Sequence, residues 1–159
     1  MTRLLTAILL IATLSLGTAA RTRTTQRGLT SSQSPVTRID ADSTAAYPDA
    51  VDQNAVILRG YTKRASDSRE SFLITNNTST RMSHVRLRFR YSALDGATLH
   101  ERDVTVEVNL KPGETRLVSI TSWDKQRMFY YHGGPQPRKA ATPYSIAFAL
   151  LGYDIPVGN

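Results

Sequence analysis

The chain has 159 residues and a formal net charge of +7, from 20 lysines and arginines against 13 aspartates and glutamates. Its lack of cysteine excludes a disulfide framework and a lipidated N-terminal cysteine. The positive charge favours an anionic partner such as nucleic acid, an acidic glycan or a lipid headgroup, although for an exported protein we prefer the simpler explanation of a soluble basic surface.

Residues 1–20 have the pattern of a secretory signal peptide. Arg3 precedes an apolar run at residues 4–16, and the small residues Thr18 and Ala20 suit cleavage after Ala20. The run is shorter than the ~20 apolar residues that cross a bilayer, so we expect cleavage rather than a membrane anchor. The sequence therefore predicts an exported protein of the periplasm or cell surface, with no transmembrane segment after cleavage. Export without disulfides favours a bacterial protein.

Residues 21–53 contain few large apolar side chains and many threonines, serines, arginines and aspartates. Such a segment buries too little apolar surface to offset the entropy lost on ordering. The sequence therefore predicts a disordered linker at 21–53 and a folded domain at 54–155.

From residue 55 onward, apolar and polar residues alternate as they do in strands that are buried on one face. The clearest case is 83–92, where apolar residues alternate with His84, Arg86, Arg88 and Arg90. No long helical pattern occurs, so the sequence predicts an all-β, antiparallel β-sandwich of about six or seven strands. The expected strands cover residues 55–61, 70–76, 83–92, 104–108, 115–122 and 144–153.

The Asp-Gly pair at 95–96 predicts a two-residue hairpin turn between two of these strands, because both positions favour a positive φ. Such a turn fixes the register and places Leu87 opposite Val104, both on the apolar face. One mismatch remains, since Arg102 then falls opposite Phe89. A bulge, or Arg102 lying over the Phe89 ring near the end of the sheet, would accommodate it.

The same register decides how Arg86, Arg88 and Arg90 are interpreted. Cations at every second residue of a strand form a stripe that is able to track a phosphate or sulfate polymer. However, the register puts Asp103 and Glu101 opposite two of the three arginines. We therefore favour a solvated face of cross-strand ion pairs over a binding stripe.

The segment 122–132 holds the single tryptophan of the chain and is followed by a loop rich in glycine, proline and cations. Ser122 is placed to cap a short helical turn over 124–130. Exposed tryptophan and tyrosine rings in such a segment would stack on sugars or on a partner protein. The alternative is that Trp123 and Phe129 close the end of the core and leave a basic loop outside. The candidate binding residues are Trp123, Arg127, Tyr130, Tyr131, Arg138 and Lys139.

Catalytic and metal-binding motifs are missing from the sequence. His84, His100 and His132 do not stand at metal-ligand spacing, and no G-x-S-x-G motif occurs. We therefore expect no enzymatic activity, no metal and no cofactor. A hydrolase whose residues are dispersed over several strands is the alternative that the sequence leaves open.

The stretch from 70 to 120 resembles a known exported pattern. It combines Phe72 to Thr78, the alternating run 85–91, the Asp-Gly turn at 95–96 and the Pro-Gly-Glu-Thr turn at 112–115. These features are similar to those of FxLYD-type immunoglobulin-like domains and of small exported β-sandwich proteins of Bacteroidetes that have no assigned function. The resemblance implies an immunoglobulin-like sandwich and says little about function.

Two functions follow as expectations. The first is a non-catalytic, exported β-sandwich module that acts in protein interaction or as a structural component of the bacterial envelope. The alternative is a module that binds carbohydrate or an acidic polymer through the aromatic and basic loop at 123–139. In both cases the expected partner is an envelope protein or glycan, and no nucleic acid is expected.

Overall fold

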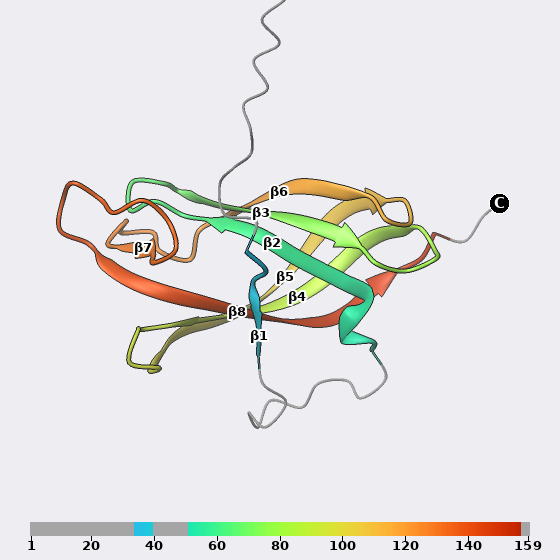
Figure 1. The fold of residues 1–159 in the computed structure, drawn as a ribbon, viewed down its shortest axis with the longest axis horizontal. Helices are drawn as coiled ribbons and strands as arrows, with labels where there is room; N and C mark the ends of the chain where they lie inside the picture. Colours follow the sequence, from blue (N-terminus) through green and yellow to red (C-terminus); the bar gives the residue numbers. More distant parts are fainter. Residues whose placement is uncertain (1–33, 40–50, 157–159) are drawn as a thin grey trace, which may run out of the picture.

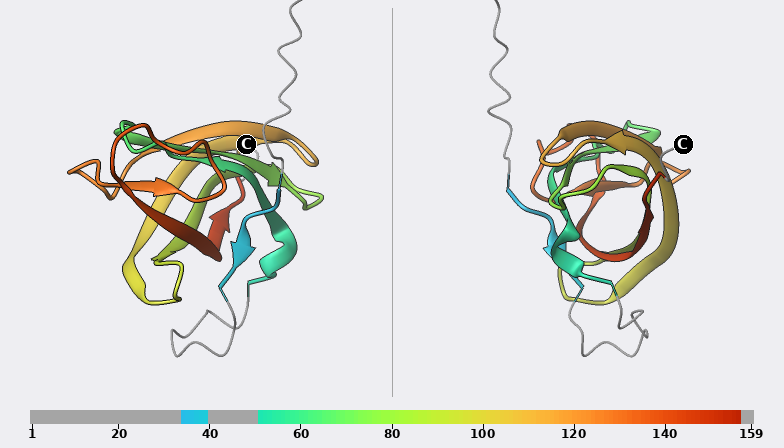
Figure 2. Two further views of the ribbon diagram at one scale, coloured as in Figure 1. Left: turned by 60° about the vertical axis from the view of Figure 1, so that its left-hand side comes forward. Right: turned by 90° about the vertical axis from the view of Figure 1, so that its right-hand side faces the viewer.

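The computed structural model describes residues 34–39 and 51–156, which form two facing β-sheets (Figure 1). The side views show both sheets curving around one shared interior (Figure 2). Within the described residues, the helical content is a single 3-10 turn, η1, at Gln53–Ala55. The strands are β1 (Thr37–Arg38), β2 (Val56–Thr62), β3 (Arg69–Asn76), β4 (Met82–Ser92), β5 (Thr98–Leu110), β6 (Thr115–Thr121), β7 (Phe129–Tyr131) and β8 (Thr142–Asp154).

The strand order confirms the expected β-sandwich. One sheet has the order β2-β3-β6, and the other has the order β1-β8-β4-β5 with β7 beside β8. The larger pairs are antiparallel, whereas β1 and β7 each pair with β8 in parallel. The two sheets thus form an all-β sandwich built mainly of antiparallel strand pairs. The strand count exceeds the expected six or seven because of the short strands β1 and β7.

The core lies between the sheets and is built from the alternation seen in the sequence. Val85, Leu87, Phe89 and Tyr91 of β4 are all fully buried. They meet residues of the facing sheet such as Phe72, whose ring lies edge-on to Phe89 with a centroid distance of 5.4 Å. Burying each large apolar side chain contributes roughly 1.5–3 kcal/mol, so this face of β4 is a main source of stability.

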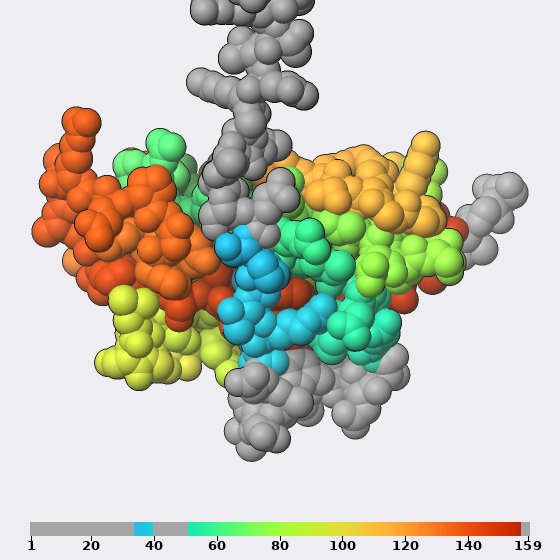
Figure 3. All heavy atoms as spheres, viewed as in Figure 1, coloured from blue at the N-terminus to red at the C-terminus, as the bar shows by residue number. Residues whose placement is uncertain are grey.

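Residues 34–39 join the two sheets along their open side. The amide of Val36 donates to the carbonyl of Leu58 at 3.0 Å, and the amide of Ile39 donates to that of Phe148 at 2.9 Å. Val36 and Ile39 are buried, and the segment fills the side between β2 and β8 in the space-filling view (Figure 3).

The linker predicted at 21–53 therefore does not include these residues. The segment is anchored through the two buried apolar side chains, Val36 and Ile39, and by backbone hydrogen bonds to both sheets, while its other residues stay at least partly exposed. Residues 51–53 are also described, and the Gln53 side-chain amide bonds both backbone groups of Leu150 at 2.8 and 2.9 Å. The predicted signal peptide at 1–20 and the rest of the predicted linker lie outside the described residues.

The β4–β5 hairpin has the predicted register from His84 to Tyr91. The turn itself is wider than two residues, because Ala93 donates to the carbonyl of Ala97 and a register shift precedes Ser92. Gly96 has the positive φ, 93°, that the Asp-Gly pair indicated, whereas Asp95 does not have one, as expected for a turn that is not of the two-residue type. The shift lets the wide turn close without changing the pairing of the long part of the hairpin.

Arg102 resolves its mismatch by reaching into the core rather than by a bulge. Its guanidinium carbon lies 5.7 Å from the centre of the Tyr91 ring. Its Nη2 donates to the fully buried carboxylate of Glu70 at 3.2 Å, and the Tyr91 hydroxyl donates to the same carboxylate at 2.7 Å. The cation thus compensates a buried charge on the opposite sheet.

Candidate functional site

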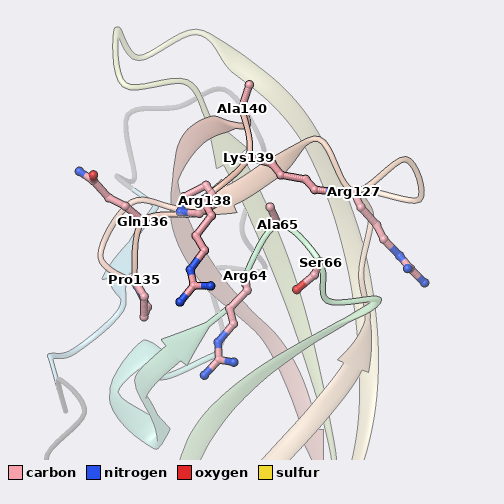
Figure 4. Close-up of a pocket in the computed structure, with 10 residues that line it drawn as sticks. Arg64, Ala65, Ser66, Arg127, Pro135, Gln136, Arg138, Lys139 and Ala140 are labelled. Carbon is pink, nitrogen blue, oxygen red and sulfur yellow. The ribbon is translucent and has the colours of Figure 1, made fainter.

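A groove of about 730 Å³ opens at one end of the sandwich. One wall is the turn between β2 and β3, and the other is the loop between β7 and β8 together with the turn before β7 (Figure 4). The groove is lined by Arg64, Ala65, Ser66, Arg127, Pro135, Gln136, Pro137, Arg138, Lys139 and Ala140.

The charged residues of this lining are all cations. Arg64, Arg127, Arg138 and Lys139 line the groove together with small apolar and neutral polar residues, and no carboxylate does. None of the four forms an ion pair with any described residue. The neighbouring Asp67 carboxylate accepts a hydrogen bond from the backbone amide of Arg64 at 3.0 Å and so belongs to the turn. We call these four cations and the space between them the basic groove.

A buried ion pair holds the two walls together. The Lys63 ammonium lies 2.7 Å from the Asp124 carboxylate, and the two side chains are 0% and 2% exposed. The same ammonium donates to the carbonyl of Phe129 at 2.7 Å, and the amide of Tyr131 donates to the carbonyl of Lys63 at 2.9 Å. Lys63 directly precedes Arg64 in the chain, so this pair, which we call the brace, fixes one wall against the other.

The protonation of Asp124 follows from this setting. Burial by itself would raise the pKa of the carboxyl group. The hydrogen bonds from Lys63 and from the amides of Phe129 and Met128 outweigh burial and hold the pKa below its usual range. The brace is therefore an ion pair at neutral pH.

Asp124 also shapes the turn that carries Arg127. Its carboxylate accepts hydrogen bonds from the amides of Met128 at 3.1 Å and Phe129 at 2.9 Å. The turn forces Arg127 to a φ of 58°, in the left-handed region that favours glycine. Of the described residues other than glycine, only Asn109 shares a positive φ, and asparagine tolerates it. Arg127 thus carries local backbone strain at the rim of the basic groove.

Trp123 closes the end of the core instead of standing in the groove. Its ring lies 5.1 Å from that of Tyr91 and 5.0 Å from that of Phe129, and it stacks on His100 at 5.5 Å. Its backbone amide donates to the carboxylate of Glu70 at 3.0 Å. The helical turn predicted over 124–130 is wrong, because the Asp124 carboxylate closes a tight turn that leads directly into β7.

The two candidate tyrosines of β7 are half-buried, and neither lines the groove. The Tyr131 ring packs edge-on against Tyr61 at 5.0 Å and against Tyr144 at 6.4 Å. Tyr130 lies opposite Pro143 of β8. The structure thus brings together Arg127, Arg138 and Lys139 of the predicted set, packs Trp123 and Tyr131 against the core, and leaves Tyr130 half-buried outside both the core and the groove.

Arg64 is the groove residue that the sequence did not single out. It stands in a polar turn 63 positions before Arg127 by their numbering, and no local motif marks it. The proximity of Lys63 to Asp124 across a separation of 61 residues is what brings it to the site.

The arginine ladder of β4 contrasts with the basic groove. Arg88 donates to both oxygens of the Asp103 carboxylate, at 2.7 and 2.9 Å, and Arg90 donates to that of Glu101 at 2.8 Å. Arg86 lies 3.4 Å from Asp154. Hydrogen bonding and charge from Arg88 hold the pKa of Asp103 below its usual range. All three arginines of the ladder therefore have a carboxylate partner.

No group of three or more histidine, aspartate or glutamate side chains within residues 34–39 and 51–156 is arranged to hold a metal ion. Burial raises the pKa of the Tyr61, Tyr91 and Tyr144 hydroxyls above the ordinary range, so they act as neutral hydrogen-bonding groups. In the same part of the chain, no helix is long and apolar enough to cross a membrane.

Comparisons of the chain with protein-family models, with curated proteins and with solved structures found no match.

Proposed function

We propose that the chain is a non-catalytic, exported binding module of the bacterial envelope, and that it binds an acidic partner through the basic groove. The observation that carries this proposal is the set of four groove cations without a carboxylate partner among the described residues. Cations that lie close together without counter-charges repel one another, and an anion between them relieves that repulsion.

The position of the aromatic residues supports a charge-driven site over an aromatic interface. Protein-interface hot spots are built on tryptophan and tyrosine rings that reach the partner. Trp123 instead contacts Tyr91, Phe129 and His100 within its own domain. The basic groove is therefore the better candidate for the contact surface than the aromatic segment.

The proposal is tested by equilibrium binding of the exported chain to heparin, an acidic polymer, and to neutral dextran over a series of salt concentrations. We expect heparin to bind and dextran not to bind. The logarithm of the heparin affinity should fall linearly with the logarithm of the salt concentration, because each occupied cation releases a counterion. Equal binding of dextran, or heparin binding that salt does not weaken, would contradict the proposal.

A further inference from the structure

The four cations of the basic groove do not converge on one point. In Figure 4 the side chains of Arg64 and Arg138 extend in the same direction on one side of the groove. The side chain of Lys139 extends the other way, toward Arg127, which lies on the opposite side. Arg138 and Lys139 are neighbours in the chain, so the loop divides its two cations between two ends of the same groove.

A ligand with one charged group contacts only one of these ends. Arg64 and Arg138 present their cations together at one end, whereas Lys139 and Arg127 supply the cations at the other end, where the Arg127 side chain extends outward from the groove. A ligand that satisfies all four cations therefore carries at least two anionic groups, spaced along an extended chain.

The lining between the two ends distinguishes among polyanions. Single-stranded nucleic acids bind by stacking their bases on aromatic rings, and the groove lining contains no aromatic residue. Extended peptides commonly add a strand to an open sheet edge, whereas turn and loop residues line this groove. The rest of the lining is small or neutral and includes Ala65, Pro137 and Ala140, so a ligand is held here through its charged groups rather than by stacking.

The backbone of Arg127 supplies an independent observation. An arginine at a φ of 58° is strained where a glycine would be relaxed, and the Asp124 carboxylate holds it there. Strained residues of this kind cluster at binding and catalytic sites. The strain is consistent with a residue whose side chain is needed at that end of the groove.

We infer that the ligand of the basic groove is a linear acidic polysaccharide, held at two ends by the pairs Arg64–Arg138 and Arg127–Lys139. This inference rests on the proposed function and adds the ligand class and the two-ended mode of binding. Both carboxylated and sulfated polysaccharides present oxyanions at the required repeated spacing, and arginine binds either group through paired N–H donors.

Calorimetric titration with oligosaccharides of graded length tests the inference. The probes are alginate oligosaccharides, which carry carboxylates, heparin oligosaccharides, which carry sulfates, inorganic sulfate and oligothymidylate. The variants are Arg64→Gln/Arg138→Gln and Arg127→Gln/Lys139→Gln, and the charge-matched control is Arg86→Gln/Arg90→Gln on the ladder. All four groove residues are exposed, so the variants should keep the circular dichroism spectrum and melting temperature close to those of the parent chain, apart from Arg127.

In the parent chain we expect an octasaccharide to bind about tenfold or more tightly than a disaccharide. Once one end of the octasaccharide is bound, its second contact costs no further loss of translational and rotational freedom. Each groove variant should abolish this gain with length while retaining disaccharide binding at the remaining end. The ladder control should keep the full gain. Whether alginate or heparin gives the larger gain identifies the anionic group.

Three results would overturn the inference and bear differently on the proposed function. Inorganic sulfate that binds as tightly as the octasaccharide would show a single anion site, and the acidic-partner proposal would stand. Oligothymidylate that binds more tightly than both polysaccharides would make the ligand class wrong. Binding that neither groove variant changes would remove the inference and the proposed function together.

Discussion

The arginine ladder of β4 and the basic groove each gather three or four cations, and they differ in what lies beside those cations. Each ladder arginine has a carboxylate within 4 Å, the nearest being Asp103 at 2.7 Å from Arg88. The groove cations have no such partner among the described residues. Basic residues in a regular row therefore form a neutralised surface here, and basic residues scattered over three loop segments form the region of uncompensated charge.

The two regions also differ in how their geometry is held. The ladder is positioned by backbone pairing between β4 and β5, and its surface ion pairs add about 0.2–1 kcal/mol each. The walls of the groove are held together by the buried ion pair Lys63–Asp124 and by hydrogen bonds from Lys63 and Tyr131 around it. Loss of one ladder carboxylate should therefore be a local event, whereas loss of one brace residue should affect the whole end of the sandwich.

The largest predicted effect separates the brace from the ladder. Asp124→Ala should destabilise the fold by about 3–5 kcal/mol, because it leaves the Lys63 ammonium buried without its counter-charge. Asp103→Ala, which removes a surface partner, should cost no more than about 1 kcal/mol. Urea unfolding followed by tryptophan fluorescence measures both. Equal losses of stability would mean that the brace is not a distinct structural element.

Removal of two cations from the groove, compared with removal of two from the ladder, should change binding rather than stability. Arg138→Gln/Lys139→Gln should weaken heparin binding by about tenfold or more, since each cation near a polyanion contributes on the order of 1 kcal/mol. Arg86→Gln/Arg90→Gln removes the same charge and should change the affinity by less than about twofold. If the ladder variant lost as much affinity as the groove variant, net charge rather than the groove would govern binding.

The variant Arg127→Gly tests whether the backbone at position 127 is strained. Glycine accepts the left-handed backbone, so this variant should be more stable than the parent chain by about 1 kcal/mol. It should also bind heparin more weakly. Arg127→Ala is the control, because it removes the same guanidinium and retains a Cβ at the strained position. A melting temperature for the glycine variant at or below that of the alanine variant would show that the turn is not strained.

The smallest predicted effect concerns the pH dependence of the ladder. The pKa of Asp103 in the folded state is lowered by Arg88, so its contribution to stability is present above the ordinary carboxyl value of about 4 and is lost as the pH falls through the lowered pKa. The group is half exposed, so the contribution should stay below about 1 kcal/mol.

This contribution is measured as the difference in unfolding free energy between the parent chain and Asp103→Asn at neutral and at strongly acidic pH. The difference should shrink on acidification. The corresponding difference for Asp124→Asn should shrink in the same direction and by more, because the pKa of Asp124 is also lowered and its side chain is buried. A difference that grows on acidification would mean that folding raises the pKa of the carboxyl group instead of lowering it.

The β4–β5 hairpin was predictable from sequence because its information is local. The alternation of apolar and basic residues defines the buried face, and pairing Arg88 with Asp103 and Arg90 with Glu101 fits one register. The partner of Arg86 was not predictable in this way, since Asp154 lies on β8, which is distant in the chain. For the same reason, the partner of Arg102 was not predictable, since Glu70 lies on the facing sheet.

The basic groove was predictable only in part. The loop composition identified Arg127, Arg138 and Lys139, but it grouped them with three aromatic residues that do not line the groove, of which Trp123 and Tyr131 pack against the core. A local pattern does not reveal whether a ring faces solvent or closes the end of a sandwich, because this depends on core residues such as Tyr91 and Phe72. Arg64 joins the site only through the brace, a contact between residues that no spacing rule connects.

The central claim is that the basic groove, and not the ladder, is where this chain meets anions. Backbone amide chemical shifts of the isotope-labelled chain, measured while an alginate octasaccharide is added, test it residue by residue. The account predicts that the shifts concentrate at residues 64–66, 127, 136 and 138–140 and saturate together. Shifts centred on residues 86–90 and 101–103 of the hairpin, with the groove loops unchanged, would contradict it.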